Sequence, residues 1–155
     1  VNINCREKTA FIGLRFFTVF GGWGRPDMLI LKFLDYAKKK KTFYVNNSGN
    51  HFRDFTYIDD VVEILNKLMT RNFKKNEIYN ICSNRPIHIK KLLSYLIKKT
   101  NYRKIKNIEH SKIEVYKTHG QNKKILKHTK FKTFSDFYIS VEKTINWYEK
   151  YKDLI

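Results

Sequence analysis

The sequence predicts an α/β fold, because segments rich in β-branched and aromatic residues alternate with segments that carry apolar residues at helical spacing. Residues 12–20, 42–45 and 77–82 have the composition of strands, and residues 89–99 and 136–151 have the pattern of amphipathic helices. The 155 residues are 42% hydrophobic and 15% aromatic, which is enough apolar material for a packed core. The chain is therefore one ordinary domain or half of a larger one.

The first elements can be placed in order. Ile12–Phe20 is predicted to be a single buried strand that runs into a turn at Gly21. Pro26 suits the first turn of a helix, and apolar residues at helical spacing extend that helix to about Lys40. A short strand at 42–45 follows, and it is closed by an Asn- and Gly-containing turn.

The rest of the chain continues the alternation. Residues 51–57 are extended and lead into a helix that we expect Asp59 to cap. The apolar side of this helix is predicted to carry Val61, Val62, Leu65, Leu68 and Met69. The later elements are predicted to be a strand at 77–82, a helix at 89–99, a strand near 105–108, a helix at 121–130 and a helix at 136–151 capped by Ser135.

The chain is strongly basic, with a net charge of +18. Residues 61–155 carry 22 basic and 8 acidic side chains, a net +14, and lysine provides most of the excess. A basic surface of this kind can bind nucleic acid phosphates, which keeps a small nucleic-acid-binding protein as an alternative. We favour lysines that decorate solvated helix faces, because no sequence signature of a nucleic-acid-binding module is present.

The sequence also bears on location. No apolar run reaches the ~20 residues that a membrane span needs, so no membrane partner is expected. Two cysteines and the lack of a basic-then-apolar leader favour a reducing compartment, and we expect a cytoplasmic location. The first residue is valine, so we expect the chain to begin inside a longer protein.

Few residues have the spacing of a metal site, a catalytic nucleophile or a cofactor-binding motif. The five histidines and two cysteines show no metal-ligand spacing, and nucleophile motifs are absent. Gly21, Gly22 and Gly24 follow a strand but lack the spacing of a dinucleotide fingerprint. Four Tyr-x-x-x-Lys pairs occur, and abundant lysine in helices explains them.

Three residues remain. Arg25 follows the carboxyl end of a strand, where open α/β sheets bind ligands, and Arg53 precedes a helix. Arginine suits two-point contacts to carboxylates or phosphates. With Thr18 they form a candidate binding set, and the alternative is that both arginines pair at the surface with Asp27 or Asp54.

Two segments resemble a known family. Gly13-Leu-Arg-Phe-Phe-Thr-Val-Phe-Gly-Gly-Trp-Gly-Arg-Pro-Asp-Met28 and Gly49-x-x-x-Arg-Asp-Phe-Thr-Tyr-Ile-Asp-Asp-Val62 are similar to two signatures of UDP-glucuronate 4-epimerases. These are NAD-dependent enzymes of the extended short-chain dehydrogenase/reductase family. Ile78–Ile81 and Val141–Tyr151 also fit the closing segments of that family.

The resemblance implies the C-terminal part of an extended Rossmann-type fold, namely its last parallel strands and the small lobe that binds the nucleotide sugar. Residues 1–155 would be this substrate-binding half, and the N-terminal NAD-binding half would be absent. In the family the NAD fingerprint and the catalytic Tyr-x-x-x-Lys precede the Gly13 strand. The resemblance therefore implies no catalytic residue here, NAD only in the complete enzyme, and no activity for this chain alone.

The resemblance also implies roles for particular residues. Thr18 and Arg25 would lie beside the sugar, near its carboxylate. Arg53 would contact the UDP diphosphate, residues 42–45 would pass the uracil, and Glu114 would lie near the ribose. Two departures stand close to the cofactor.

The first departure is Phe20, which replaces a tyrosine near the nicotinamide and is the cofactor-binding candidate. The second is Gly22, which replaces a proline. In the complete enzyme, C4 of the sugar would be oxidised to a ketone and reduced again from the other face. The resemblance leaves three readings: a fragment of the epimerase, an inactive remnant or half-enzyme that needs a partner, and the nucleic-acid-binding protein.

Without an N-terminal half, residues 1–155 would leave apolar sheet surface uncovered. The strands at Gly13 and Glu77 would lie in a larger parallel sheet in the family, so part of that sheet would be bare here. We expect residues 1–155 alone to expose apolar surface, to fold poorly and to aggregate. A homodimer is expected only for the full-length form.

Overall fold

The computed structural model describes residues 10–109 and 115–154. The strands are β1 (Ile12–Phe16), β2 (Thr18–Phe20), β3 (Phe43–Asn46), β4 (Phe52–Tyr57), β5 (Glu77–Ile81), β6 (Pro86–His88) and β7 (Ile105–Ile108). The helices are α1 (Leu29–Lys38), α2 (Ile58–Met69), α3 (Ile89–Thr100), α4 (Lys123–Thr129) and α5 (Phe137–Tyr151), with a short 3₁₀ helix at Asn47–Gly49. The predicted α/β class is confirmed.

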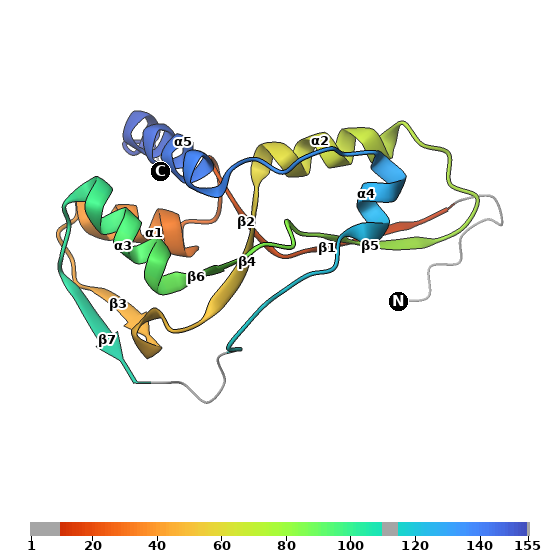
Figure 1. Cartoon of the computed structure of the whole chain (residues 1–155). Coiled ribbons are helices and arrows are strands. Elements are labelled where there is room, and N and C mark those ends of the chain that lie inside the picture. Colours follow the sequence, from red (N-terminus) through yellow and green to blue (C-terminus); the bar gives the residue numbers. More distant parts are fainter. Residues whose placement is uncertain (1–9, 110–114, 155) are drawn as a thin grey trace.

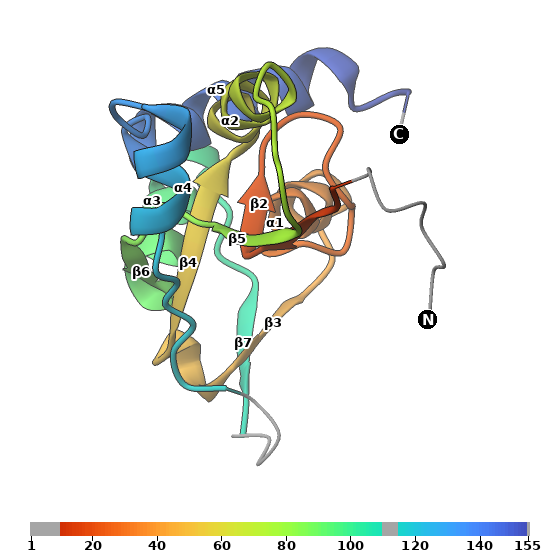
Figure 2. The same ribbon diagram turned by 90° about the vertical axis from the view of Figure 1, so that its right-hand side faces the viewer.

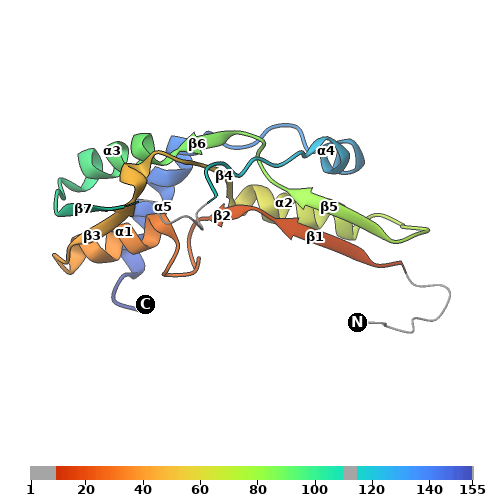
Figure 3. The ribbon, with the colours of Figure 1, turned by 90° about the horizontal axis from the view of Figure 1, so that it is seen from below.

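The molecule is elongated, with two groups of elements at its ends (Figures 1 and 3). One end holds β1, β5, α2 and α4, and the other holds β3, β7, α1 and α3. Strands β2, β4 and β6 connect the two ends, and α5 lies against β4 (Figure 2). Among the described residues, no helix has the length and apolar character that crossing a membrane requires.

Parallel pairing dominates the sheets. Strand β1 pairs with β5, β2 with β4, and β3 with β7, all in parallel, while β6 adds to β4 antiparallel. Parallel strands need crossover connections, and each parallel pair here is separated in sequence by at least one helix, α1 for β2 and β4 and α2 and α3 for β3 and β7. The end of the molecule that holds β1 and β5 is a two-stranded sheet, and α2 and α4 cover it.

The predicted single strand at 12–20 is interrupted at Phe17. Up to Phe16 the chain pairs with β5, whereas Thr18 already pairs with Phe55 of β4. A hydrogen bond of 2.9 Å from the Val19 amide to the Phe17 carbonyl closes a three-residue turn at the break. One apolar run in the sequence thus serves two different sheets, which composition alone does not distinguish.

The helix after the glycine loop begins later than predicted. The Met28 amide donates to the Arg25 carbonyl at 3.1 Å, so Arg25–Met28 forms a turn with Pro26 at its second position. Helix α1 then begins at Leu29. The prediction that Pro26 occupies the first helical turn is wrong because proline serves the preceding turn instead.

Two predicted helix caps are also wrong. Tyr57 precedes α2 without a side-chain cap, and Asp59 lies within the first turn. Helix α5 is capped by Asp136, whose carboxylate accepts from the Ile139 amide at 2.9 Å. Ser135 does not cap it, because the hydroxyl and amide of Ser135 both donate to Asp60, at 2.7 and 3.1 Å.

Two hydrophobic cores stabilise the ends separately. The larger joins α1, α3 and α5 to β3 and the middle sheet, around residues such as Phe33, Leu92 and Val141. The smaller joins α2, α4 and β5 around Ile64 and Ile81. Val62 and Met69, predicted on the apolar side of α2, are instead 46% and 76% exposed.

Gly120 is buried where a side chain would not fit. A Cβ there would approach Cys82 Sγ to 2.3 Å and the Phe17 ring to 2.8 Å. We predict that Gly120→Ala lowers the free energy of unfolding by about 1–3 kcal/mol through overpacking, measured by denaturant titration. Gly13→Ala is the control, because its Cβ would meet Ile78 at an ordinary 3.4 Å. Equal stability of the two variants would contradict this packing.

Candidate functional site

The loop from Gly21 to Asp27 follows the carboxyl end of β2, and its glycines pack against the chain itself. Gly21 has φ +143°, and a Cβ there would approach Ile58 to 2.3 Å. A Cβ on Gly22 would meet the Trp147 indole at 2.8 Å. Helix α5 and the start of α2 therefore hold this loop closely, and the glycines make that approach possible.

Arg25 lies at the surface of this loop. Its guanidinium makes a two-point contact with the Asp27 carboxylate, with Nε–Oδ1 at 3.1 Å and Nη2–Oδ2 at 2.6 Å. This hydrogen bond is the main cause that raises the pKa of Arg25 and lowers the pKa of Asp27. Both side chains are largely exposed, so water screens the pair and another carboxylate can replace Asp27. The alternative that Arg25 pairs with Asp27 is confirmed.

Thr18 is half-buried on β2. It lines a small cavity of about 20 Å³ with Phe20, Gly21, Gly24 and residues of the α1 N-terminal region. That volume is about the space of a single water, so the side chain is adjacent to the loop but not in an open cleft within the described residues.

A larger pocket joins the loop to β3. It has a volume of about 260 Å³. It is lined by Asp27, Leu29, Lys32, Phe43, Tyr44, Val45, Asn46, His51, Ile89 and Leu93. The pocket thus brings together the end of the Arg25 loop and the strand predicted at 42–45, two segments that the resemblance assigns to one ligand.

Arg53 is half-buried on β4. Its Nη1 donates to the carbonyls of Phe52, at 2.8 Å, and Val115, at 2.7 Å. Backbone hydrogen bonds from Phe52 to Tyr116 and from Thr118 to Phe52 extend this contact. Arg53 therefore helps to hold residues 115–118 beside β4.

Asp54, the other partner considered for Arg53, is fully buried. Its carboxylate accepts from the Ser83 hydroxyl and the Gly120 amide, each at 2.9 Å. Burial, followed by the Asp54 charge, raises the pKa of the neighbouring Cys82 thiol to about 12. Cys82 is therefore a packed thiol and not a nucleophile at neutral pH.

Phe20, the cofactor-binding candidate, is only 6% exposed. Its ring packs against the rings of Phe55, Tyr57 and Phe137, with centroids 5.4–5.8 Å apart. The side chain belongs to the core beneath α5. A contact with NAD stays a prediction.

Glu114 lies outside the described residues, as does Cys5. Two side chains of the larger pocket, Lys32 and His51, were not selected from the sequence. Lys32 lies one helical turn after Met28, the last residue of the first signature segment. That closeness was the sequence signal that could have identified it as a pocket residue. His51 is buried, and the sequence pattern gave no reason to separate it from ordinary histidines.

The glycines of the loop after β2 are closely packed. The three glycines after β2 are packed against Ile58, Trp147 and Leu31, so no open backbone cradle remains there for a diphosphate. Across residues 10–109 and 115–154, no group of three or more His, Cys, Asp or Glu is arranged to hold a metal ion.

The Arg25 loop follows the carboxyl end of β2, the position at which open α/β sheets bind ligands. The chain belongs to the NAD dependent epimerase/dehydratase family, whose model matches residues 2–82. That match includes the Arg25 loop, β3 and Arg53.

Individual proteins with similar sequences support the same family assignment. Protein CapI of Staphylococcus aureus is 31% identical over 157 residues, which cover 90% of this chain and 47% of CapI. UDP-glucuronate 4-epimerase 4 of Arabidopsis thaliana is 30% identical over 156 residues, covering 90% of this chain and 36% of that protein. The chain thus spans about half or less of these relatives.

A solved structure shows the same fold. It is the UDP-glucuronic acid 4-epimerase of Bacillus cereus in complex with UDP-glucuronic acid and NAD, with a TM-score of 0.78 and 21% identity. The match covers 88% of this chain and 44% of that one. The described fold therefore corresponds to part of a larger Rossmann-like architecture.

The Arg25–Asp27 pair gives a pH-dependent prediction. Because Arg25 lowers the pKa of Asp27, the pair persists above that lowered pKa and is lost as the pH falls through it. We expect a carboxyl NMR titration to show a lowered pKa for Asp27 that returns to the ordinary range in Arg25→Gln. Arg15→Gln, an exposed arginine on β1, should change nothing. An unchanged titration in Arg25→Gln would show that the pair does not form in solution.

Proposed function

We propose that this chain is the nucleotide-sugar-binding portion of an NAD-dependent UDP-sugar 4-epimerase that interconverts UDP-glucuronate and UDP-galacturonate. The observation that carries the proposal is the pocket between the Arg25 loop and β3, because two separate signature segments meet there. Membership of the epimerase/dehydratase family gives the class of reaction. The similarity to a UDP-glucuronate 4-epimerase supports the choice of sugar.

The pocket has properties suited to one end of the nucleotide. Phe43 and Val45 are buried, whereas Tyr44 is 53% exposed. The exposed Tyr44 ring is suited to stacking on a flat base such as uracil, and the polar side chains of Lys32 and Asn46 are suited to hydrogen bonds with that base. In this proposal the base lies along β3, as the resemblance implies.

Arg53 would bind the diphosphate. One of its guanidinium nitrogens holds the Phe52 and Val115 carbonyls, so its position on β4 is fixed before any ligand arrives. A planar guanidinium has five donor hydrogens and can hold a backbone carbonyl and a phosphate together. Glu114, next to Val115 in sequence, would lie near the ribose.

Arg25 and Thr18 would orient the sugar. The uronate carboxylate can replace Asp27 on the exposed Arg25 guanidinium, since both are carboxylates and the existing pair is screened by water. Such an exchange would favour a sugar that carries an acid over a neutral one. In this proposal proton and hydride transfer belong to the NAD-binding half of the enzyme, and this chain's share is binding and orientation.

A second part of the proposal concerns the portion of the longer relatives that this chain does not match. A groove of about 540 Å³ lies beside β1 and α2. It is lined mainly by apolar side chains, namely Ile12, Leu14, Val62, Leu65, Leu68, Met69 and Phe73, with Asn66 and Arg71. We assign this groove to contact with an NAD-binding half, because β1 pairs with β5 alone among the described strands and the relatives are about twice as long.

Arg53→Ala tests the nucleotide site. A hydrogen bond to a charged group contributes about 1.5–3 kcal/mol, so the affinity for UDP-glucuronate should fall roughly 10- to 100-fold. The affinity for uridine, which has no phosphate, should change little. Both are measured by isothermal titration calorimetry on the full chain.

The control is Arg103→Ala, a surface arginine after α3, which should bind UDP-glucuronate as the wild type does. Thermal melting checks that each variant is folded. If Arg53→Ala weakens UDP-glucuronate and uridine equally, or weakens neither, Arg53 is not a diphosphate ligand.

The groove is tested by charge insertion. Val62→Glu with Met69→Glu should reduce aggregation of the chain and weaken its association with a separately expressed N-terminal half of CapI at least ~10-fold, measured by analytical ultracentrifugation. Ile139→Glu on α5 is the control, because Ile139 is also exposed, at 59%, but lies outside the groove. Association that survives the double substitution would exclude the groove as the docking surface.

A further inference from the structure

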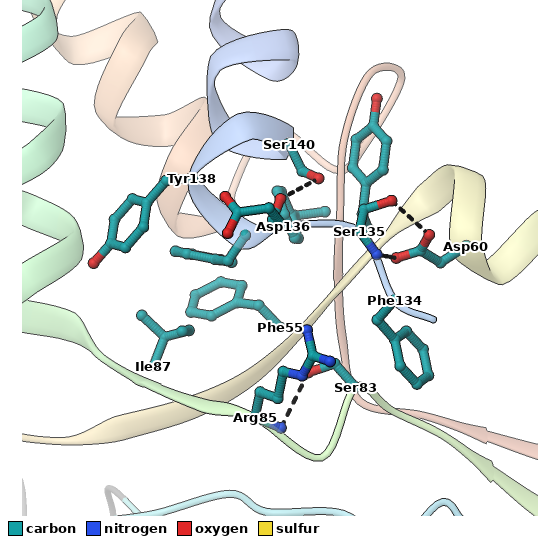
Figure 4. A pocket seen from close by; sticks show the side chains of 13 residues that line it. Phe55, Asp60, Ser83, Arg85, Ile87, Phe134, Ser135, Asp136, Tyr138 and Ser140 are labelled. Carbon is teal, nitrogen blue, oxygen red and sulfur yellow. Dashed lines mark hydrogen bonds between the residues drawn. The ribbon is translucent and has the colours of Figure 1, made fainter. Parts of the chain in front are cut away.

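A cavity of about 220 Å³ lies beneath the N-terminal end of α5, apart from the pocket at β3 (Figure 4). Its floor comes from the middle sheet, with Phe20 of β2, Phe55 of β4 and Ile87 of β6. The first residues of α5 close the other side. Of the candidate site residues that the structure describes, Phe20 lines this cavity, whereas Thr18, Arg25 and Arg53 do not.

The walls are largely aromatic. Phe137 packs against Phe20 and Phe55, with ring centroids 5.4 Å apart in both pairs. Phe55 is 4% exposed, so the sheet side of the cavity is well ordered by the core. An apolar, flat occupant is therefore favoured, because it would remove further aromatic surface from water.

The charged groups around the cavity differ in one respect. The Asp60 carboxylate accepts two hydrogen bonds from Ser135, and the Asp136 carboxylate accepts one from Ile139. Arg85 comes from the loop before β6, and its guanidinium is turned toward the cavity (Figure 4). Its backbone amide donates to Ser83, but its guanidinium makes no hydrogen bond or ion pair with any described residue.

This difference favours a negatively charged ligand in the cavity. The Asp60 and Asp136 carboxylates already accept hydrogen bonds from described residues, whereas the Arg85 guanidinium donates a hydrogen bond to none of them. A carboxylate at the cavity mouth would give Arg85 a two-point, charge-assisted contact.

We propose that this cavity binds a small aromatic carboxylate, with the ring among Phe20, Phe55 and Phe137 and the carboxylate on Arg85. The volume equals about seven waters at the liquid share of ~30 Å³ each, which suits a single ring with a short acidic arm. A nucleotide sugar is too large for it.

The probe is phenylacetate, titrated into the full chain and followed by ligand-observed NMR. Two molecules of the same shape serve as comparison: 2-phenylethanol, which is neutral, and 2-phenylethylamine, which is positive. We expect phenylacetate to bind at least ~10-fold more tightly than either. Equal binding of the three, tighter binding of the amine, or no binding of phenylacetate overturns the proposal.

Two variants locate the site. Arg85→Gln should weaken phenylacetate at least ~10-fold without changing the melting temperature, because Arg85 is exposed and its side chain has no bond to lose. Arg103→Gln is the matched control and should bind normally. Ile87→Phe, which fills the cavity, should abolish binding while the chain still melts cooperatively. Unchanged affinity in a folded Arg85→Gln or Ile87→Phe variant would place any binding elsewhere and overturn the proposal.

Discussion

The buried carboxylate of Asp54 is the constraint on which the middle of the molecule depends. Asp54 is fully buried on β4, where its carboxylate accepts from the Ser83 hydroxyl and the Gly120 amide and its own amide donates to Thr118. These hydrogen bonds join β4 to the loop after β5 and to the segment after residue 114. A buried charge is tolerated only with such partners, so the three segments are held in a single arrangement.

The candidate site follows from that arrangement. Because Asp54 fixes β4 and the 115–120 segment together, the adjacent Arg53 holds the Val115 carbonyl in a defined position. The loop with Arg25 is positioned independently, through Gly21 and Gly22 packed on α2 and α5. The larger core then places β3 beside α1, which completes the pocket. The proposed binding lobe is thus rigid, while the groove at β1 and α2 is left apolar and exposed.

Much of this could be predicted from the sequence, and the failures have physical causes. Periodicity located α3 and α5 to within two residues, because each helix buries one regular face. It could not find the break at Phe17, since both halves of that apolar run are strands and only tertiary pairing separates them. Ser135 was wrong as a cap because Asp60, a partner distant in sequence, takes its hydroxyl and amide, and Asp59 was wrong because α2 already begins at Ile58. The position of Arg85 over a cavity depended on α5, more than fifty residues away in sequence.

The most direct test of the account is amide hydrogen exchange on the full chain with and without UDP-glucuronate. The account predicts slower exchange on binding in three segments that are separate in sequence: the loop at 21–27, β3, and residues 52–53 with 115–118. Helix α4 and the last turn of α3, which carry exposed lysines and line no part of the pocket, should exchange unchanged. Protection confined to those helices, or no protection at saturating UDP-glucuronate, would contradict the assignment of this chain as the nucleotide-sugar-binding portion of an epimerase.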